Sequence, residues 1–417
     1  MNRHAEITHN QVLAVISLGM LLRIIWALFV PVEPISDSAA YDAFARTLAT
    51  HGVYGWTAAE PGAFWAVGTS AIVAVTYRIL GDSYTGVVVL NLLASLLTMV
   101  LVFRLGEIWF GRLPAFLATA CIAIWPNLIA FTTILSSELY FIALTLLGLW
   151  YWERRDGAPW MNVLLCGVAW GLACYVRPVI LLLPFALILA ALPRGTASTA
   201  RTTLRAIAAM ALILGVVSPW TYRNLQLFGE PVLVSTNFGP NLWMGNNPDT
   251  DGGYMHPPKW AQDMTEIERA HALGDAAKEY IRSDIPGFVV RTMRKAAMLH
   301  ASETIGVSWN QAAIERGLGK AAVVGMKVVS TGFWLLMLGA AIGGIIVMAR
   351  RNIIEALLHP TVIAWAYFAA IPAVIVADQR YHMPATPFIA LLAGVFCAFL
   401  IKLFLNKPAE SISHGAT

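Results

Sequence analysis

Apolar runs of about 20 residues recur along the whole chain, and they constrain its fold more than any other feature. A helix of that length crosses the hydrocarbon core of a bilayer, where only helices and closed barrels satisfy their own backbone polar groups. Of the 417 residues, 58% are hydrophobic and 12% are charged, whereas roughly 25% are charged in an average soluble protein. We therefore expect an all-α polytopic membrane protein.

Basic residues cluster after alternate apolar runs. The clusters are Arg104 and Arg112, Arg154 and Arg155, Arg194, Arg201 and Arg205, Arg350 and Arg351, and Lys402 and Lys407. The positive-inside rule places these clusters in the cytoplasm. It predicts about ten spans with both termini cytoplasmic: 11–31, 84–103, 113–132, 134–152, 160–176, 178–193, 203–219, 325–348, 360–376 and 382–403.

The long apolar run from Met161 to Leu192 is flanked by basic clusters on both sides, so it must cross the membrane an even number of times. Arg177-Pro178 is the expected outer turn, because a residue that precedes proline disfavours the helical region. Both arms are then close to the short limit of about 17 residues for a span.

Two segments are expected to lie outside, 32–83 and 220–320, within one membrane domain of residues 1–404. The first should hold a short helix over 38–50 that ends at Gly52, and the second should hold helices over 262–282 and 286–300. Segment 63–80 is expected to lie at the interface; the alternative, a further span, would invert the topology. Residues 405–417 are expected to form a disordered cytoplasmic tail.

Several classes of site are disfavoured. The four cysteines, Cys121, Cys166, Cys174 and Cys397, all fall inside apolar runs, without the spacing of a zinc site or a place in an outside loop for a disulfide. We find no basic patch with interleaved aromatic residues, so we expect no nucleic-acid partner.

Three arginines occupy predicted outer span ends: Arg177, Arg223 and Arg380. Charge at this depth is costly unless it meets an anion or a cavity. With the acidic segment 36–42 on the same side, the pattern suggests a site for a phosphorylated lipid beside a carboxylate base. The alternative is that these arginines reach the headgroups or form structural ion pairs.

A set of short motifs resembles the GT-C superfamily of polytopic glycosyltransferases, above all the dolichyl-phosphate-mannose protein mannosyltransferases and bacterial relatives that use undecaprenyl-phosphate sugars. The motifs are Ser36-Asp37, Pro61 to Gly68, Trp125-Pro126-Asn127, Ser137-Glu138, Arg177-Pro178, Pro219 to Asn224, Leu242 to Pro248 and Arg380 to Pro384. The chain departs from the aminoarabinose and protein-mannosyl branches because Asp37 is followed by Ser38, where those branches have an Asp-Glu pair.

The resemblance implies a site at the outer membrane face, with a carboxylate of the first outside loop as general base. Asp37 is the candidate base and Asp42 the reserve; Asp37 could instead cap the helix over 38–50. Arg177, Arg223 and Arg380 are candidates to hold the donor phosphate, because guanidinium groups bind phosphate oxygens in pairs.

Further candidates line the same expected site. Tyr381 and His382 would lie beside the donor phosphate. The residues expected to contact substrate are Glu138, Trp65, Asn246 and Asn247. Each has a simpler alternative role. Glu138 could form an ion pair with Arg177 or Arg23, Trp65 could belong to the aromatic belt at the membrane surface, and the two asparagines could be turn residues.

The sequence thus predicts a glycosyltransferase of the bacterial inner membrane that moves a sugar from a polyprenyl-phosphate donor to an acceptor hydroxyl. The acceptor, a protein, lipid or glycan, is left open. No cofactor or metal is required where arginines supply the charge; a bound divalent cation is the alternative. The rival functions are a flippase of lipid-linked sugars and an outer-face oligosaccharide ligase or polymerase.

Overall fold

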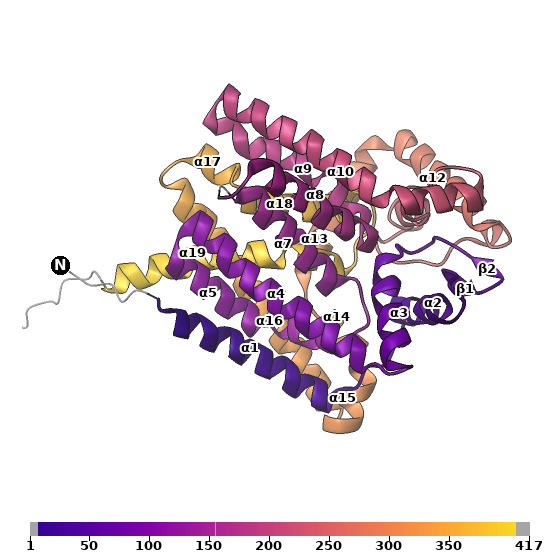
Figure 1. Ribbon diagram of the computed structural model, residues 1–417, viewed down its shortest axis with the longest axis horizontal. Coiled ribbons are helices and arrows are strands. Elements are labelled where there is room, and N and C mark those ends of the chain that lie inside the picture. Colours follow the sequence, from indigo (N-terminus) through magenta and orange to yellow (C-terminus); the bar gives the residue numbers. More distant parts are fainter. Residues whose placement is uncertain (1–6, 155, 406–417) are drawn as a thin grey trace, which may run out of the picture.

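A computed structural model describes residues 7–154 and 156–405 as helices with one two-stranded hairpin. The long helices run side by side, and the two described chain ends, in α1 and α19, lie at the same end of the bundle (Figure 1). This placement agrees with an even number of crossings. Arg155, Lys407 and the predicted tail apart from Leu405 lie outside the described residues.

Among the described residues, six helices are long and apolar enough to span a bilayer, and a seventh span arises if one bent pair is counted. The six are α1 (His9–Phe29), α4 (Thr85–Phe110), α8 (Pro159–Val176), α10 (Thr196–Phe228), α16 (Lys320–Ala349) and η5 with α19 (Gln379–Ala385 and Thr386–Leu405). The bent pair is α5 (Arg112–Ala123) with α6 (Pro126–Ala130) and η1 (Phe131–Thr133). The all-α polytopic fold is confirmed, whereas the count of ten stays a prediction.

The remaining predicted spans are shorter or irregular. They correspond to α7 (Glu138–Glu153), α18 (Pro360–Val374) and the segment Pro178–Arg194, which is built from η2 (Pro178–Leu182), α9 (Leu183–Ala186) and η3 (Leu187–Arg194). Because a 3₁₀ helix rises about 2.0 Å per residue, against 1.5 Å in an α-helix, Pro178–Arg194 extends over about 32 Å. This stretching lets a short arm match the hydrocarbon core. As expected, α8 ends at Val176 and Arg177 is extended.

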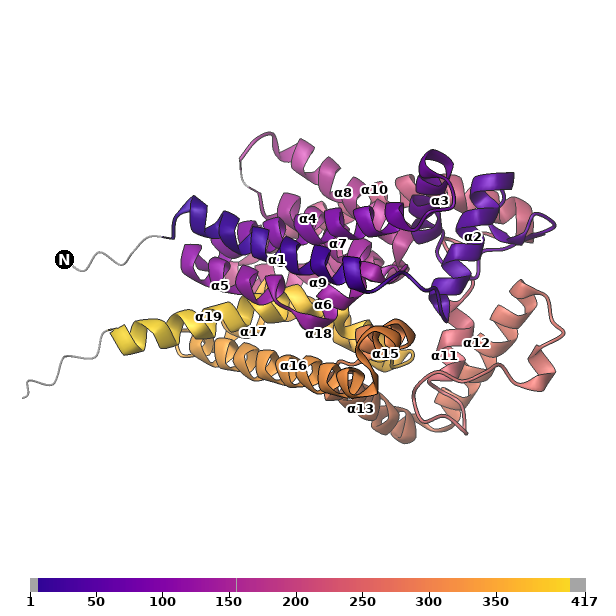
Figure 2. The ribbon, with the colours of Figure 1, turned by 90° about the horizontal axis from the view of Figure 1, so that it is seen from below.

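The two segments predicted to lie outside, which we continue to call the outside segments, gather at the end of the bundle opposite the described chain ends (Figures 1 and 2). The first comprises α2 (Asp37–His51), β1 (Gly55–Thr57), β2 (Glu60–Pro61) and α3 (Gly68–Leu80). The second comprises α11 (Phe238–Met244), η4 (Lys259–Ala261), α12 (Glu266–Ser283), α13 (Ile285–Ala301), α14 (Ile305–Trp309) and α15 (Gln311–Leu318). At the other end, α17 (Ile353–Leu357) joins α16 to α18.

One helix runs past the membrane boundary predicted for it. The second outside segment is predicted to begin at Trp220; α10 continues through Pro219 to Phe228 and ends on Gly229 in the left-handed conformation. With 33 residues, α10 is about 50 Å long, well beyond a hydrocarbon core of about 30 Å. Its last turns, which carry Arg223, therefore rise above the bundle.

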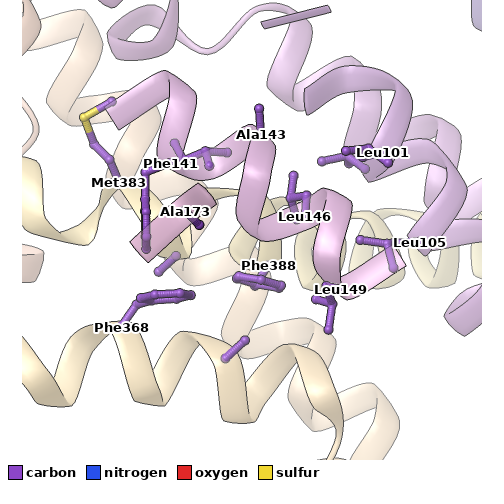
Figure 3. Packing of buried hydrophobic residues seen from close by; sticks show 14 of the residues in the cluster. Leu101, Leu105, Phe141, Ala143, Leu146, Leu149, Ala173, Phe368, Met383 and Phe388 are labelled. Carbon is purple, nitrogen blue, oxygen red and sulfur yellow. The ribbon is translucent and has the colours of Figure 1, made fainter. Parts of the chain in front are cut away.

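The core lies around α7, between α4, α8 and the C-terminal helices. Figure 3 shows Phe141, Leu146 and Leu149 of α7 facing Phe368 of α18 and Phe388 of α19. The rings of Phe141 and Phe368 meet edge to face at 5.8 Å. Such interlocked packing fixes both ends of α7, and its outer end begins at Glu138.

Arg23 stabilises the break in the third predicted span. Between α5 and α6 the chain bends by 52° at Trp125-Pro126, and Pro126 has no N–H to donate to the carbonyl of Ile122. The fully buried guanidinium of Arg23 donates to the carbonyls of Ile122 and Ala123 at 3.0 and 2.9 Å. Arg23 therefore provides hydrogen bonds to backbone carbonyls at the helix break, and it makes no ion pair with Glu138.

We predict that Arg23→Leu lowers the stability of the purified protein by about 2–4 kcal/mol, because each buried polar group left without a partner costs about 1–3 kcal/mol. Thermal unfolding in detergent measures this loss. Arg104→Leu is the matched control, since Arg104 is more than half exposed and its described partner is Glu107. Equal stability of the Arg23 and Arg104 variants would contradict the role of Arg23.

Candidate active site

Asp37 is the first residue of α2, directly after a sharp turn. Ser36 has a φ of 52°, and within 7–154 and 156–405 it is the one non-glycine residue with positive φ. The Asp37 side chain does not cap the helix. Instead its Oδ2 lies 2.5 Å from Nη2 of Arg380, while Oδ1 accepts no hydrogen bond from a described residue. One carboxylate oxygen is therefore open to another partner.

Arg380 enters from the opposite end of the chain, on η5. The Asp378 side chain caps η5 by accepting from the backbone N–H of Arg380 at 3.0 Å. The guanidinium lies against the rings of Trp309 and Tyr381, each at 5.2 Å. Its buried Nε makes no hydrogen bond to a described residue, but it lies 3.7 Å from Oδ1 of Asp378, so Arg380 pairs with two carboxylates.

A second arginine–carboxylate pair also lies beside Tyr381. The guanidinium of Arg177 is also 5.2 Å from the Tyr381 ring, and its Nη1 is 3.4 Å from Oε1 of the fully buried Glu138. That Oε1 has no hydrogen bond within the described residues. Asp37, Arg380, Tyr381, Arg177 and Glu138 thus form a row of alternating charges around one aromatic ring, which we call the acid–arginine row.

Tyr41 is a member of this neighbourhood that the sequence analysis did not single out. It follows Asp37 by four residues on α2, so the two side chains share a helix face. Burial raises the pKa of Tyr41, and the charges of Asp37 and Glu138 raise it further, against Arg380 and Arg177. Its hydroxyl stays protonated and bonds to no other described residue. The i, i+4 spacing from Asp37 was the signal available.

The structure does not bring Arg223 or His382 to the row. Arg223 donates to the carbonyls of Gly62 and Tyr54 and stacks on Trp220, which ties α10 to the first outside segment. His382 is buried, bonded to Glu303 at 3.1 Å and to the carbonyl of Leu299 at 2.7 Å. The side chains of Arg223 and His382 therefore form hydrogen bonds that hold parts of the fold together, away from the acid–arginine row.

Asp42, the reserve base, is likewise engaged. Its two oxygens accept from the hydroxyls of Tyr77 and Tyr84 at 2.5 and 3.0 Å and pair with Arg46 at 3.1 Å. These bonds fasten α2 to α3 and α4. Trp65 packs edge to face against Phe44, Trp56 and Phe64 in an aromatic cluster under the hairpin.

Asn246 and Asn247 are buried and hold the second outside segment together, in line with the turn alternative. The Asn246 amide donates to the carbonyls of Val374 and Ile375 at the end of α18. Lys295 of α13 donates to the same two carbonyls and to Asn246 Oδ1. The sequence predicts an interfacial amphipathic helix over 286–300, with Lys295 among its basic residues. Lys295 is instead fully buried, and it donates to carbonyls that the end of α18 leaves without helical partners.

The row has the parts of a group-transfer site. Asp37 offers a free oxygen that can take a proton, and two arginines beside it can stabilise negative charge on a departing group. Within the described part of the chain, no group of three or more histidine, cysteine, aspartate or glutamate side chains could hold a metal ion.

Comparison with known proteins gives a family match and a fold. Residues 66–222 match the family model of dolichyl-phosphate-mannose-protein mannosyltransferases, a segment that contains Glu138 and Arg177 but neither Asp37 nor Arg380. No curated protein matches the chain significantly.

Among solved structures, the archaeal oligosaccharyltransferase AglB from Archaeoglobus fulgidus, in complex with an inhibitory peptide and a dolichol-phosphate, superimposes with a TM-score of 0.56 at 12% identity over 94% of this chain. The chain spans about half of that protein's length, 51%. ArnT from Cupriavidus metallidurans bound to undecaprenyl phosphate gives a TM-score of 0.49 at 14% identity, covering 94% of this chain and 78% of that one. The resemblance inferred from the sequence motifs is confirmed.

Lys295 yields a prediction on pH. Burial lowers its pKa from 10.5 to about 8. Below pH 8 both the folded and unfolded states hold the proton, and folding bears the cost of burying the ammonium group. Between about pH 8 and 10.5 the unfolded chain binds more protons, so stability should rise with pH, by up to about 3 kcal/mol.

Thermal unfolding of the wild type and of Lys295→Met from pH 7 to 10 tests this sign. The rise in stability should occur in the wild type relative to the variant, which lacks the titrating group. The variant should also be less stable at every pH, because the carbonyls of Val374 and Ile375 lose a donor. Parallel pH profiles of the two proteins would refute the assignment.

Proposed function

We propose that this chain, a GT-C membrane protein by its fold and its family-model match, transfers a sugar from a polyprenyl-phosphate donor to an acceptor hydroxyl. The observation that carries the proposal is the contact of Asp37 with Arg380, which sets a partly exposed carboxylate against a guanidinium beneath the outside segments. We further propose that this end of the bundle is the outer face of a bacterial inner membrane, as the basic clusters at the other end predict.

In the proposed reaction the acceptor hydroxyl gives its proton to Oδ1 of Asp37, the oxygen that Arg380 leaves free. The acceptor oxygen forms a bond to the anomeric carbon of the sugar, and the bond from that carbon to the phosphate oxygen breaks. The electron pair of the broken bond stays on the phosphate. A single displacement of this kind inverts the anomeric centre.

Arg380 and Arg177 would hold the phosphate. Both guanidinium groups lie 5.2 Å from the centre of the Tyr381 ring; Arg177 pairs with Glu138, and Arg380 pairs with Asp37 and Asp378. A donor phosphate adds negative charge, which these two guanidinium groups can stabilise. Glu138 keeps Arg177 oriented in the absence of donor, and the protonated Tyr41 hydroxyl can donate to a sugar or phosphate oxygen.

The base assignment predicts that Asp37→Asn lowers the transfer rate by about 10²–10⁴-fold, the usual contribution of a general base. Purified protein would be given radiolabelled undecaprenyl-phosphate monosaccharides and a cell-envelope fraction as acceptor pool, and label in the product would be counted. Asp82→Asn is the matched control, because Asp82 is an exposed carboxylate of the same outside segment. Unchanged transfer by the Asp37 variant would overturn the assignment.

The donor-phosphate assignment predicts a different pattern for the arginines. Arg380→Gln should weaken binding of sugar-free undecaprenyl phosphate by about 10- to 100-fold, since a hydrogen bond to a charged group contributes about 1.5–3 kcal/mol. Asp37→Asn should bind this lipid at least as tightly as the wild type, because it removes a negative charge next to the phosphate. Arg282→Gln, an exposed arginine at the end of α12, is the control.

The same assay separates the rival functions. Transfer only from a pyrophosphate-linked oligosaccharide would favour the ligase. This alternative is tested because the chain shares its fold with an oligosaccharyltransferase. Lipid movement between leaflets without any glycosidic product would favour the flippase and overturn the proposal.

A further inference from the structure

A second anion-binding feature lies at the opposite end of α7 from the acid–arginine row. A cavity of about 80 Å³ opens there between the ends of three helices; its polar lining is Glu153 and Arg154 of α7, Arg194 of η3, and Thr202 and Arg205 of α10. Since about 10–15 Å³ on this scale holds one water, the cavity has room for a phosphate-sized group. The 16 residues of α7 separate it from Glu138 by about 22 Å.

We propose that this cavity binds the phosphate of an anionic phospholipid in the leaflet that faces the basic clusters and the chain termini. This inference does not depend on the proposed transferase activity. It rests on two arginines with unused donors, on the cavity between them, and on the apolar surface beside it.

Arg205 is held in place by the floor of the cavity. Its guanidinium stacks on the buried ring of Trp152 at 4.6 Å and donates one hydrogen bond to the Trp152 carbonyl. A guanidinium has five N–H groups, and no other hydrogen bond joins this one to the described residues. The stacked, fixed plane therefore presents its remaining donors without further loss of side-chain entropy.

Arg194, across the cavity, makes no hydrogen bond or ion pair with any residue in 7–154 or 156–405. Arg154 is paired through two bonds with Asp156, a largely exposed carboxylate that a phosphate can replace. Glu153 also lines the cavity and opposes an anion. The balance still favours negative charge, because Arg194 and Arg205 carry two positive charges that no described carboxylate neutralises.

A lipid fits the surroundings better than a soluble anion. The other wall of the cavity is η3, whose apolar residues include the buried Leu187, while Leu189 and Leu192 are about half exposed beside Arg194. A phosphate between Arg194 and Arg205 would sit at the end of three membrane helices, with apolar surface directly alongside for the acyl chains. Basic pockets between spans on this side of a membrane commonly bind anionic headgroups.

The test is native mass spectrometry of the delipidated full-length protein titrated with phosphatidylglycerol. The Arg194→Gln/Arg205→Gln double variant should bind it at least ten-fold more weakly than the wild type. Arg201→Gln is the matched control: Arg201 is on the same helix, one turn from Arg205, but bonds back to Ala197 and lies outside the cavity lining. Its binding should equal that of the wild type.

Three outcomes would overturn the proposal. They are equal binding by the double variant, equal affinity of the wild type for phosphatidylcholine, and displacement of the bound lipid by inorganic phosphate at comparable concentration, which would identify a soluble anion as the ligand. Should Arg205→Gln lose its fold through the contact with Trp152, Arg194→Gln alone carries the test, because Arg194 supports no described residue.

Discussion

The contact between Asp37 and Arg380 joins residues 343 positions apart and closes the outer end of the bundle. Asp37 begins the first outside segment, and Arg380 begins the last membrane helix. A buried charge at this depth persists only when it is paired or hydrogen-bonded, so each residue restricts where the other can lie. Around the pair, the rings of Tyr381 and Trp309 pack against the Arg380 guanidinium, and Arg177 pairs with Glu138 beside the same Tyr381 ring.

Carbonyl groups freed at helix breaks and ends determine where the other buried cations go. Arg23 meets the break between α5 and α6, and Lys295 meets the end of α18. Both side chains donate to carbonyls rather than to a carboxylate. Buried backbone groups such as these have no water to bond with, so a single long cation can replace several missing N–H donors. The buried cations therefore fall into two groups. Arg380 and Arg177 pair with carboxylates, whereas Arg23 and Lys295 donate to backbone carbonyls.

The sequence predicted the features that depend on local chemistry. Arg177-Pro178 ends a helix because proline restricts its neighbour, and Gly52 ends α2 because it adopts the left-handed conformation. Contacts between distant segments could not be predicted in this way. The helical pattern of 286–300 gave a basic face but not its orientation, so the burial of Lys295 was missed. The continuation of α10 past Pro219 was not predicted, because proline in a helix interior usually ends the helix.

The segment Pro178–Arg194 has a consequence for how the protein meets its membrane. Most of its residues are in 3₁₀ turns, whose hydrogen bonds are poorer than those of an α-helix. Conversion of those turns to α-helix would shorten the segment by about 6 Å, from the difference in rise per residue. Pro184 and Pro193 oppose that conversion, because proline in a helix interior removes a hydrogen bond and clashes with the preceding turn. The bilayer thickness that this part of the protein can span is therefore set by its 3₁₀ geometry rather than by its residue number.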